Sequence, residues 1–343
     1  MSFMLALPKI SLHGAGAIGD MVKLVAGKQW GKALIVTDGQ LVKLGLLDSL
    51  FAALDEQQMA YQLFDEVFPN PTEALVQQGY AAYQAARCDY LIAFGGGSPI
   101  DTAKAIKILT ANPGPSTAYS GVGKVKNAGV PLVAINTTAG TAAEMTSNAV
   151  IIDSERQVKE VIIDPNLIPD IAVDDASVML DIPPAVTAAT GMDALTHAVE
   201  AYISKDANPV TDTAAMQAIR LIARNLRQAV ALGSNLQARE NMAYASLLAG
   251  MAFNNANLGY VHAMAHQLGG LYDMPHGVAN AVLLPHVARY NLIANPEKFA
   301  DIAELMGENI TGLSTLDAAE KAIAAITRLS MDIGIPRICA IWG

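Results

Sequence analysis

The chain has 343 residues, of which 52% are hydrophobic and 16% are charged, and its formal net charge is −10 at pH 7. This composition excludes a disordered chain and is typical of a globular protein with a large core. The acidic balance, without clustered Lys and Arg, argues against nucleic acid and membrane surfaces as partners. Two distant cysteines, no apolar run of membrane-spanning length and no recognisable signal peptide predict a cytoplasmic protein.

The first half of the chain alternates short apolar runs with amphipathic stretches. Buried strands are expected at residues 32–38, 61–65, 89–94 and 131–136, and helices at residues 41–57 and 73–86. Strands that alternate with helices form a parallel sheet covered on both faces. We therefore predict an α/β, Rossmann-like nucleotide-binding domain over residues 1–182.

The pattern changes after Pro183-Pro184 to long stretches rich in Ala and Leu with helical periodicity. These stretches cover residues 186–201, 210–233, 236–255 and 260–271, and few β-branched runs remain beyond them. We predict an all-α second domain over residues 183–343.

Two glycine runs compete for a phosphate-binding role. The segment from Gly14 to Gly19 matches GxGxxG, but no long buried strand leads into it, so we interpret it as a turn before the first helix. The run Gly95-Gly96-Gly97-Ser98 follows a strong strand directly, and Pro99 suits the first turn of a helix. A strand, a glycine run and a helix start form the geometry that cradles a pyrophosphate. This second run is the stronger candidate.

Two further segments suit the same nucleotide site. The segment from Asn136 to Thr141 follows the next strong strand and could line the same crevice at the carboxyl edge of the sheet. Asp38 ends an early strand, where its carboxylate could hold the ribose hydroxyls. An acidic side chain there disfavours a 2′-phosphate, so NAD is expected rather than NADP.

Histidines cluster in the predicted helical domain. Only six are present in the chain, and Asp193 with His197, and His262 with His266, are pairs spaced i, i+4 on one helix face. His276 stands in a Pro-His-Gly turn beyond the second pair. Imidazole and carboxylate ligands suit Fe(II), Zn(II), Co(II) or Mn(II). Spacing alone leaves five candidates for a four-ligand site and does not rank His262 against His266.

At these residues the chain resembles the iron-containing (group III) alcohol dehydrogenases, from about residue 8 to about residue 336. The resemblance rests on the segments 69–72, 95–101, 137–141, 188–200 and 259–286. It implies an N-terminal α/β nucleotide-binding domain, a helical metal-binding domain and an active site in the cleft between them.

The resemblance also implies roles for individual residues. The implied metal ligands are Asp193, His197, His262 and His276, with Fe(II) as the ion and Zn(II) as an alternative occupant. The implied NAD(H) site comprises Asp38, Gly95, Gly96, Gly97, Ser98, Asp101, Thr137, Thr138, Thr141 and Lys159. His266 is implied to lie near the nicotinamide, as a proton relay or as a structural group. Asn148 and Phe253 are implied to face the substrate, although Phe253 could equally be an ordinary core aromatic.

The implied activity is a metal-dependent, NAD(H)-linked interconversion of small primary alcohols or diols with aldehydes. The expected pairs are 1,3-propanediol with 3-hydroxypropanal, or 1,2-propanediol with lactaldehyde. The metal would act as a Lewis acid that lowers the pKa of the alcohol, while hydride passes to the nicotinamide. A homo-oligomer, a dimer or larger, is also implied.

The resemblance ends after Gly334-Ile335-Pro336, because the last seven residues match nothing in the family, which continues for a few tens of residues. We therefore expect a truncated or altered C-terminus that exposes apolar surface and lowers activity. One alternative is a catalytically weak or inactive subunit. Another is a dehydroquinate-synthase-like lyase of the same fold, although few basic residues lie between Asp193 and His276 to hold its substrate.

Overall fold

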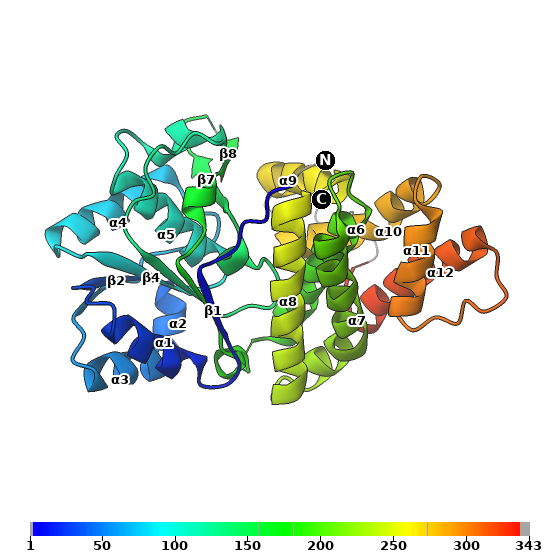
Figure 1. Cartoon of the computed structure of the whole chain (residues 1–343), viewed down its shortest axis with the longest axis horizontal. Coiled ribbons are helices and arrows are strands. Elements are labelled where there is room, and N and C mark those ends of the chain that lie inside the picture. The colour runs from blue at the N-terminus through cyan, green and yellow to red at the C-terminus, as the bar shows by residue number, and fades with distance from the viewer. Residues whose placement is uncertain (1–2, 157, 181, 273, 337–343) are drawn as a thin grey trace. The chain divides into compact units, whose positions relative to one another are not determined.

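The computed structural model describes residues 3–156, 158–180, 182–272 and 274–336, and the chain divides into two compact units (Figure 1). Leu5–Thr137 and Ala143–Val178 form an α/β unit, and the remaining described residues, including Thr138–Ala142, belong to a mostly helical unit. The predicted fold class, an α/β part followed by a helical part, is confirmed. Residues 337–343, where an altered C-terminus was expected, lie outside the described residues.

The α/β unit is built on a six-stranded parallel sheet with the order β1-β9-β6-β4-β2-β3. Its strands are β1 (Ile10–His13), β2 (Ala33–Val36), β3 (Tyr61–Phe64), β4 (Tyr90–Gly95), β6 (Leu132–Asn136) and β9 (Ile171–Asp174). Strands β2, β4, β6 and β9 are buried along their whole length. The four predicted strands are all present, whereas β1 and β9 were not predicted.

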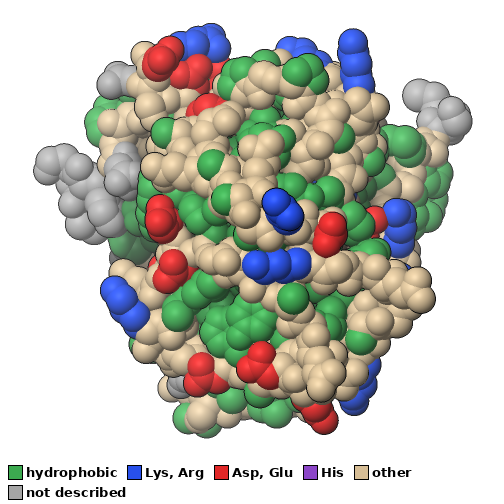
Figure 2. Space-filling view, turned by 90° about the vertical axis from the view of Figure 1, so that its left-hand side faces the viewer, with side chains coloured by type: hydrophobic (Ala, Val, Ile, Leu, Met, Phe, Trp, Pro, Cys, Tyr) green, Lys and Arg blue, Asp and Glu red, His purple; other side chains and the backbone are tan. Residues whose placement is uncertain are grey.

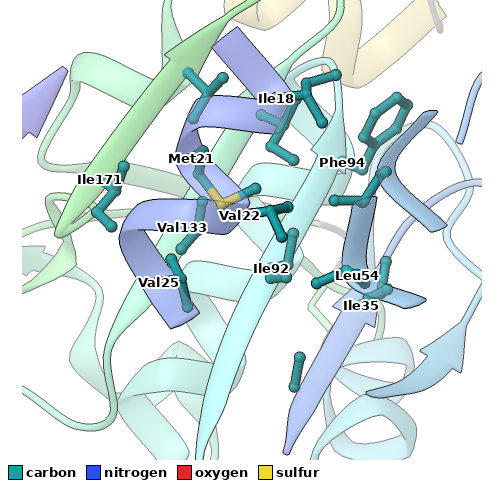
Figure 3. Packing of buried hydrophobic residues seen from close by; sticks show 14 of the residues in the cluster. Ile18, Met21, Val22, Val25, Ile35, Leu54, Ile92, Phe94, Val133 and Ile171 are labelled. Atoms are coloured by element: carbon teal, nitrogen blue, oxygen red, sulfur yellow. The ribbon is translucent and has the colours of Figure 1, made fainter. Parts of the chain in front are cut away.

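Helices cover both faces of this sheet, because alternate side chains of each strand enter opposite cores. On one face, α1 (Ala17–Ala26) and α3 (Asp48–Glu56) pack against Ile35, Ile92 and Val133 (Figure 3). On the other face, α4 (Glu73–Ala85) and α5 (Gly97–Leu109) pack against the neighbouring residues Leu34, Leu91 and Leu132. The one-residue offset between the two sets places the sheet between two apolar layers.

The prediction of one continuous helix at residues 41–57 is wrong. The structure has two helices there, α2 (Gly39–Lys43) and α3, separated by Gly45 with a φ of 71°. That backbone conformation is left-handed and interrupts a right-handed helix, and glycine adopts it without a steric penalty.

A second, smaller sheet was not predicted. It has the order β5-β8-β7 and consists of β5 (Gly121–Val122), β7 (Asn148–Asp153) and β8 (Val158–Ile163). Strands β7 and β8 pair antiparallel. Lys104 on α5 ties this helix to the segment that leads into β7, because its buried Nζ donates to the carbonyl oxygens of Ala143, Thr146 and Asn148.

The helical unit contains α6 (Pro184–Ile203), α7 (Pro209–Ala231), α8 (Leu236–Ala256), α9 (Tyr260–Tyr272), α10 (His276–Leu292), α11 (Pro296–Leu305) and α12 (Thr315–Asp332). Helix α6 is buried on almost every side from Gly191 to Tyr202, and it packs against α7, α8 and α10. Side-chain caps start several helices: Asn208 begins α7 in a capping box with Thr211, and Asn235 begins α8.

Two surface properties bear on the expected partners. Among the residues that the structure describes, no helix combines the length and apolar character needed to cross a membrane. On the face shown in Figure 2, the described Lys and Arg side chains are interspersed with Asp and Glu. That face therefore presents a field of mixed sign rather than the basic surface that attracts nucleic acid.

Glu144 is a buried acid near the end of the sheet, and its burial should make the free energy of unfolding of the protein depend on pH. It is 0% exposed, and among the described residues neither carboxyl oxygen has a hydrogen-bond partner. Burial, followed by the charge of Asp174, raises the pKa of Glu144 well above its usual range. Folding therefore favours the protonated acid, and the stability present below the unfolded pKa of about 4.3 is lost as pH rises through the folded value.

We accordingly expect Glu144→Gln to stabilise the protein at pH 8, on the order of 1–3 kcal/mol, because it removes an unpaired buried charge. The difference from the parent protein should shrink toward zero near pH 4.5. Denaturant unfolding at both pH values measures it. Glu56→Gln, at an exposed position on α3, is the matched control and should show no such pH dependence. A variant difference that is the same at both pH values would contradict this account.

Candidate functional site

The metal cluster predicted from the histidine spacing is assembled from three helices. Asp193 and His197 lie one turn apart on α6 and are 2% and 3% exposed. His262 lies in the first turn of α9, and His276 is the first residue of α10. The expectation that His276 stands on a loop is corrected, because the helix begins at this residue, directly after Pro275 at the N-cap.

A close helix approach brings His276 to the residues of α6. A Cβ atom added to Gly277 would lie 2.4 Å from the carbonyl oxygen of Ala189 on α6. Real Cβ atoms do not approach backbone atoms so closely, so only glycine permits this contact between α10 and α6. The small residue is therefore a condition for the cluster to form.

The geometry and chemistry of the four side chains fit one divalent transition metal. Their ligand atoms all lie within 4.8 Å of one another. Asp193 Oδ1 is 3.7 Å from His262 Nε2 and 3.5 Å from His276 Nε2. Ligands at about 2.1 Å from a common ion are separated by distances of this order, and three imidazoles with one carboxylate suit Fe(II) or Zn(II).

The electrostatic environment keeps Asp193 and His197 in the protonation states that can bind a metal, an ionised carboxylate and a neutral ring. Burial lowers the pKa of His197 to about 3, so its ring is neutral. Burial would raise the pKa of Asp193, but its interactions with the surrounding imidazoles, His197, His276 and His262, outweigh burial and hold the pKa below its usual range. Burial would likewise lower the pKa of His262, but the nearby carboxylates of Asp193 and Glu200 outweigh burial and raise the pKa to about 9. A bound cation would have to displace that proton from His262.

Phe253 packs on a ligand ring. Its ring is stacked on that of His197 at a centroid distance of 4.2 Å, and His197 is stacked in turn on His262 at 4.5 Å. Phe253 is only 5% exposed. The aromatic therefore fixes the plane of His197, which is compatible with either of the roles expected for it.

His266 lies one turn after His262 on α9 but is not one of the four grouped residues. Its ring centroid is 5.3 Å from that of His276 and 6.3 Å from that of His262. The structure thus separates two histidines that spacing alone could not rank. His266 borders the cluster, and the roles implied for it stay predictions.

Glu200 is a site residue that sequence reasoning missed. Its Oε2 is 2.6 Å from His262 Nδ1, and its Oε1 accepts from the backbone N–H of Val261 at 2.7 Å. Glu200 is 2% exposed. A carboxylate on the outer nitrogen of a ligand histidine fixes its tautomer and ring orientation. A local signal existed, because Glu200 follows His197 by three residues and Asp193 by seven and so shares their helix face. The spacing did not identify its partner, which lies 62 residues away.

Asn280 was also missed, although a signal existed. It follows His276 by four residues on α10, the same spacing that identified the two predicted pairs. Its Nδ2 lies 2.6 Å from Asp193 Oδ1 and 3.1 Å from His262 Nε2. An asparagine is a weaker metal signal than histidine or a carboxylate, which is why the spacing was passed over.

The predicted nucleotide residues of the α/β unit gather at the carboxyl ends of three adjacent strands. Asp38 comes shortly after β2, the glycine run begins at Gly95, the last residue of β4, and Thr137 follows β6. These strands are neighbours in the sheet. The connection after β2 runs to β3 at one edge of the sheet, whereas the connection after β4 runs to β6 in the opposite direction, so β2 and β4 flank a switch point where open α/β sheets bind ligands. The sheet order therefore places the stronger glycine run where a nucleotide is expected.

The backbone of the glycine run requires glycine. Gly95 has a φ of 146°, and a Cβ atom there would lie 2.6 Å from Pro99 Cγ. Gly96 is the N-cap of α5, and Gly97 and Ser98 form its first turn, so their N–H groups point out of a helix N-terminus. By contrast, the segment Gly14–Gly19 forms the turn from β1 into α1, as expected.

The other predicted cofactor and substrate residues have partners of their own. Asp101 on α5 accepts from the backbone N–H of Val150 on β7, and burial raises its pKa to about 6. Lys159 Nζ donates to Asn70 Oδ1 at 3.0 Å, and Asn148 accepts from Ser147. Thr138 and Thr141 belong to the helical unit.

Comparison with known protein families shows to which family the chain belongs. The model described as "Iron-containing alcohol dehydrogenase" matches residues 8–176, and that of the "Fe-containing alcohol dehydrogenase family, C-terminal" matches residues 187–340. The chain belongs to the iron-containing alcohol dehydrogenase family. This iron-containing alcohol dehydrogenase is therefore an enzyme, an oxidoreductase, and the four-residue cluster stands in the part that the second model matches.

Individual members of the family are also similar to this chain over most of its length. This alcohol dehydrogenase is 64% identical to 1,3-propanediol dehydrogenase of Klebsiella pneumoniae, over 96% of this chain and 86% of the relative. It is 46% identical to lactaldehyde reductase of Escherichia coli (strain K12), over 98% of this chain and 88% of the relative. A crystal structure of a 1,3-propanediol oxidoreductase superposes with a TM-score of 0.98 and 62% identity, over 100% of this chain and 90% of that chain.

Proposed function

We propose that this alcohol dehydrogenase interconverts 1,3-propanediol and 3-hydroxypropanal with NAD(H) and a divalent metal. The observation that carries the proposal is the convergence of Asp193, His197, His262 and His276 within 4.8 Å. The identity to 1,3-propanediol dehydrogenase favours this diol over 1,2-propanediol, whose aldehyde is the substrate named for the more distant relative.

The proposed metal is Fe(II), with Zn(II) as an alternative occupant, and members of the family use iron together with NAD(H). When bound, the ion supplies Lewis-acid polarisation of the alcohol or carbonyl oxygen. The protein's part is to present Asp193 as a carboxylate and His197 as a neutral ring, and to fix His262 through Glu200. Elemental analysis of the purified protein identifies the occupant.

The decisive assay follows absorbance at 340 nm with metal-loaded enzyme and NAD, comparing 1,3-propanediol with 1,2-propanediol. A higher kcat/KM for 1,3-propanediol supports the proposal, and a higher value for 1,2-propanediol replaces it with the lactaldehyde reaction. A metal-loaded, folded sample that stays flat with both diols supports the inactive-subunit alternative. Turnover of a sugar phosphate without alcohol oxidation would favour the lyase.

Asp38 is proposed to select NAD over NADP through its charge at the end of β2. Its Oδ1 also caps α2 by accepting from the N–H of Gln40 at 2.7 Å. Asp38→Asn keeps a good capping residue but removes the charge, so we expect the preference for NAD over NADP to fall by about tenfold, the effect of roughly 1.4 kcal/mol. Ratios of kcat/KM for the two cofactors measure it. The exposed Asp48→Asn on α3 is the control, and an unchanged ratio in Asp38→Asn would contradict the role.

The remaining assignments of residues to the cofactor site and the substrate site are also proposals. Besides Asp38, the nucleotide site is proposed to include Gly95–Ser98, Asp101, Thr137, Thr138, Thr141 and Lys159. Asn148 and Phe253 are proposed to act on the substrate side, and His266 as the proton relay. The domains are proposed as residues 1–182 and 183–343. A cytoplasmic location and a homo-oligomer are also proposed, and light scattering after size-exclusion chromatography tests the latter.

A further inference from the structure

A buried lysine of α5 holds the backbone of residues 143–148. Lys104 is 0% exposed, and its Nζ donates to the carbonyl oxygens of Ala143 at 2.7 Å, Thr146 at 2.8 Å and Asn148 at 2.7 Å. An ammonium group has three N–H donors, which matches these three carbonyls. Thr146 Oγ1 is also 2.9 Å from Nζ, so one of the donors is shared. One side chain thus fixes this segment at three points.

The charge of Lys104 is balanced within its own helix. Asp101 lies one turn earlier on α5, and it accepts from the N–H of Val150 on β7 at 3.1 Å. Burial lowers the pKa of Lys104 to about 8, and the charge of Asp101 opposes the effect of burial. The ammonium form, with its three donors, therefore prevails at pH 7. Together the two side chains attach α5 both to β7 and to the segment that leads into it.

These attachments fix both ends of the threonine loop, residues 138–142. At its start, the N–H of Thr137 donates to the carbonyl oxygen of Gly95 at 3.0 Å. At its end, Lys104 holds the carbonyl oxygen of Ala143. Both flanking residues, Thr137 and Ala143, belong to the α/β unit, and both are held by the strand and helix that carry the glycine run. A loop with fixed ends has less conformational freedom to lose when it binds a ligand.

We propose that Lys104 is a positioning residue for the nicotinamide cofactor, because it fixes the end of the threonine loop at Ala143 before the cofactor binds. The proposal rests on the nucleotide site proposed above, which includes Thr137, Thr138 and Thr141. Lys104 has no exposed surface, so it acts through the backbone that it holds and not by contact with the cofactor. Its loss should therefore weaken the binding of NAD(H) and leave turnover at saturating cofactor close to that of the parent.

The test measures the Kd of NADH by fluorescence titration at pH 7 in the parent protein, Lys104→Met and Lys104→Gln. Methionine has a similar length and no donor. Glutamine keeps two N–H donors on a chain that is one atom shorter, and it provides a second variant if methionine fails to fold. We expect the Kd to rise about tenfold in Lys104→Met, because the released segment must be ordered on binding, and to rise less in Lys104→Gln.

A second measurement separates positioning from a purely structural role. In the metal-loaded enzyme, the KM for NAD should rise in parallel with the Kd of NADH, while kcat at saturating NAD stays close to that of the parent. A lysine that served only the fold would instead lower the fraction of protein that binds NADH, and the Kd of the folded fraction would not change.

Lys107→Met is the matched control, because Lys107 is a second buried lysine on α5. Its Nζ lies 3.4 Å from the carbonyl oxygen of Ile168 and 3.5 Å from Asp170 Oδ2, so it holds a different segment. Its replacement should lower stability and leave the Kd of NADH unchanged. An unchanged Kd in a folded Lys104 variant, or an equal rise in Lys107→Met, overturns the positioning role. A parent protein that binds no NADH overturns the nucleotide site itself, and with it this inference.

Discussion

Replacing His262 with alanine is expected to abolish stoichiometric metal binding and NAD-linked alcohol oxidation together. His262 is the residue that the other groups are arranged around: it contacts Glu200 through Nδ1, Asn280 through Nε2 and the ring of His197 by stacking. Its removal leaves three ligands and an unpaired buried carboxylate. The loss of kcat/KM should exceed the roughly 10–100-fold effect typical of residues that only support a ligand.

Metal content by elemental analysis and initial rates at 340 nm measure the effect. Two histidines serve as controls. His286→Ala lies on the exposed side of α10 and should keep both metal and activity. His266→Ala should keep the metal and lose activity, because this ring borders the cluster without belonging to it. A His262→Ala protein that retains one ion per chain and full turnover would show that the assigned site is wrong.

Glu200→Gln is expected to lower metal affinity by about 10–100-fold without unfolding the protein. The carboxylate contacts His262 Nδ1 at 2.6 Å and also accepts from the N–H of Val261. Burial would raise the pKa of Glu200, but the hydrogen bond to His262 outweighs it, so the group is ionised. Glutamine preserves the shape and one acceptor but removes the charge that makes His262 a better donor to the metal.

Competition with a chromophoric chelator measures this affinity, and circular dichroism confirms the fold. The control is Glu304→Gln, at an exposed position on α11, where no change is expected. If Glu200→Gln bound Zn²⁺ as tightly as the parent, Glu200 would be a structural cap of α9 rather than a positioning residue.

The sequence predicted those parts of the fold that are encoded locally. Residues 89–94 form a buried strand and residues 236–255 a helix, because apolar composition and 3.6-residue periodicity are properties of neighbouring residues. Strands β1 and β9 escaped prediction, and their length does not explain it, because β2 and β3 are equally short and were predicted. The break at Gly45 escaped because a glycine within a helical pattern is often tolerated.

In the candidate site, too, the residues that could be predicted are those with a local spacing pattern. The pairs Asp193 with His197 and His262 with His266 were visible as helical spacings. Only the packing of three helices places His262 among the four grouped residues and leaves its neighbour His266 outside them. The spacing of Glu200 from His197 placed it on the same helix face, but its contact with His262 depends on the approach of α9 to α6 across 62 residues and could not be predicted. Asn280 carried a usable spacing to His276, but its side-chain type gave it little weight.

The close contact of Gly277 with α6 holds α10 against α6, and a metal ion bound between these helices would add to the stability of the folded enzyme. The four proposed ligands belong to α6, α9 and α10, so an ion bound by them would crosslink segments 83 residues apart in the chain, from position 193 to position 276. A ligand that binds only the folded state stabilises it by about 2.7 kcal/mol when its free concentration is 100 times its Kd. Metal supply would then set how much of this protein escapes proteolysis, so iron starvation should lower its abundance as well as its activity.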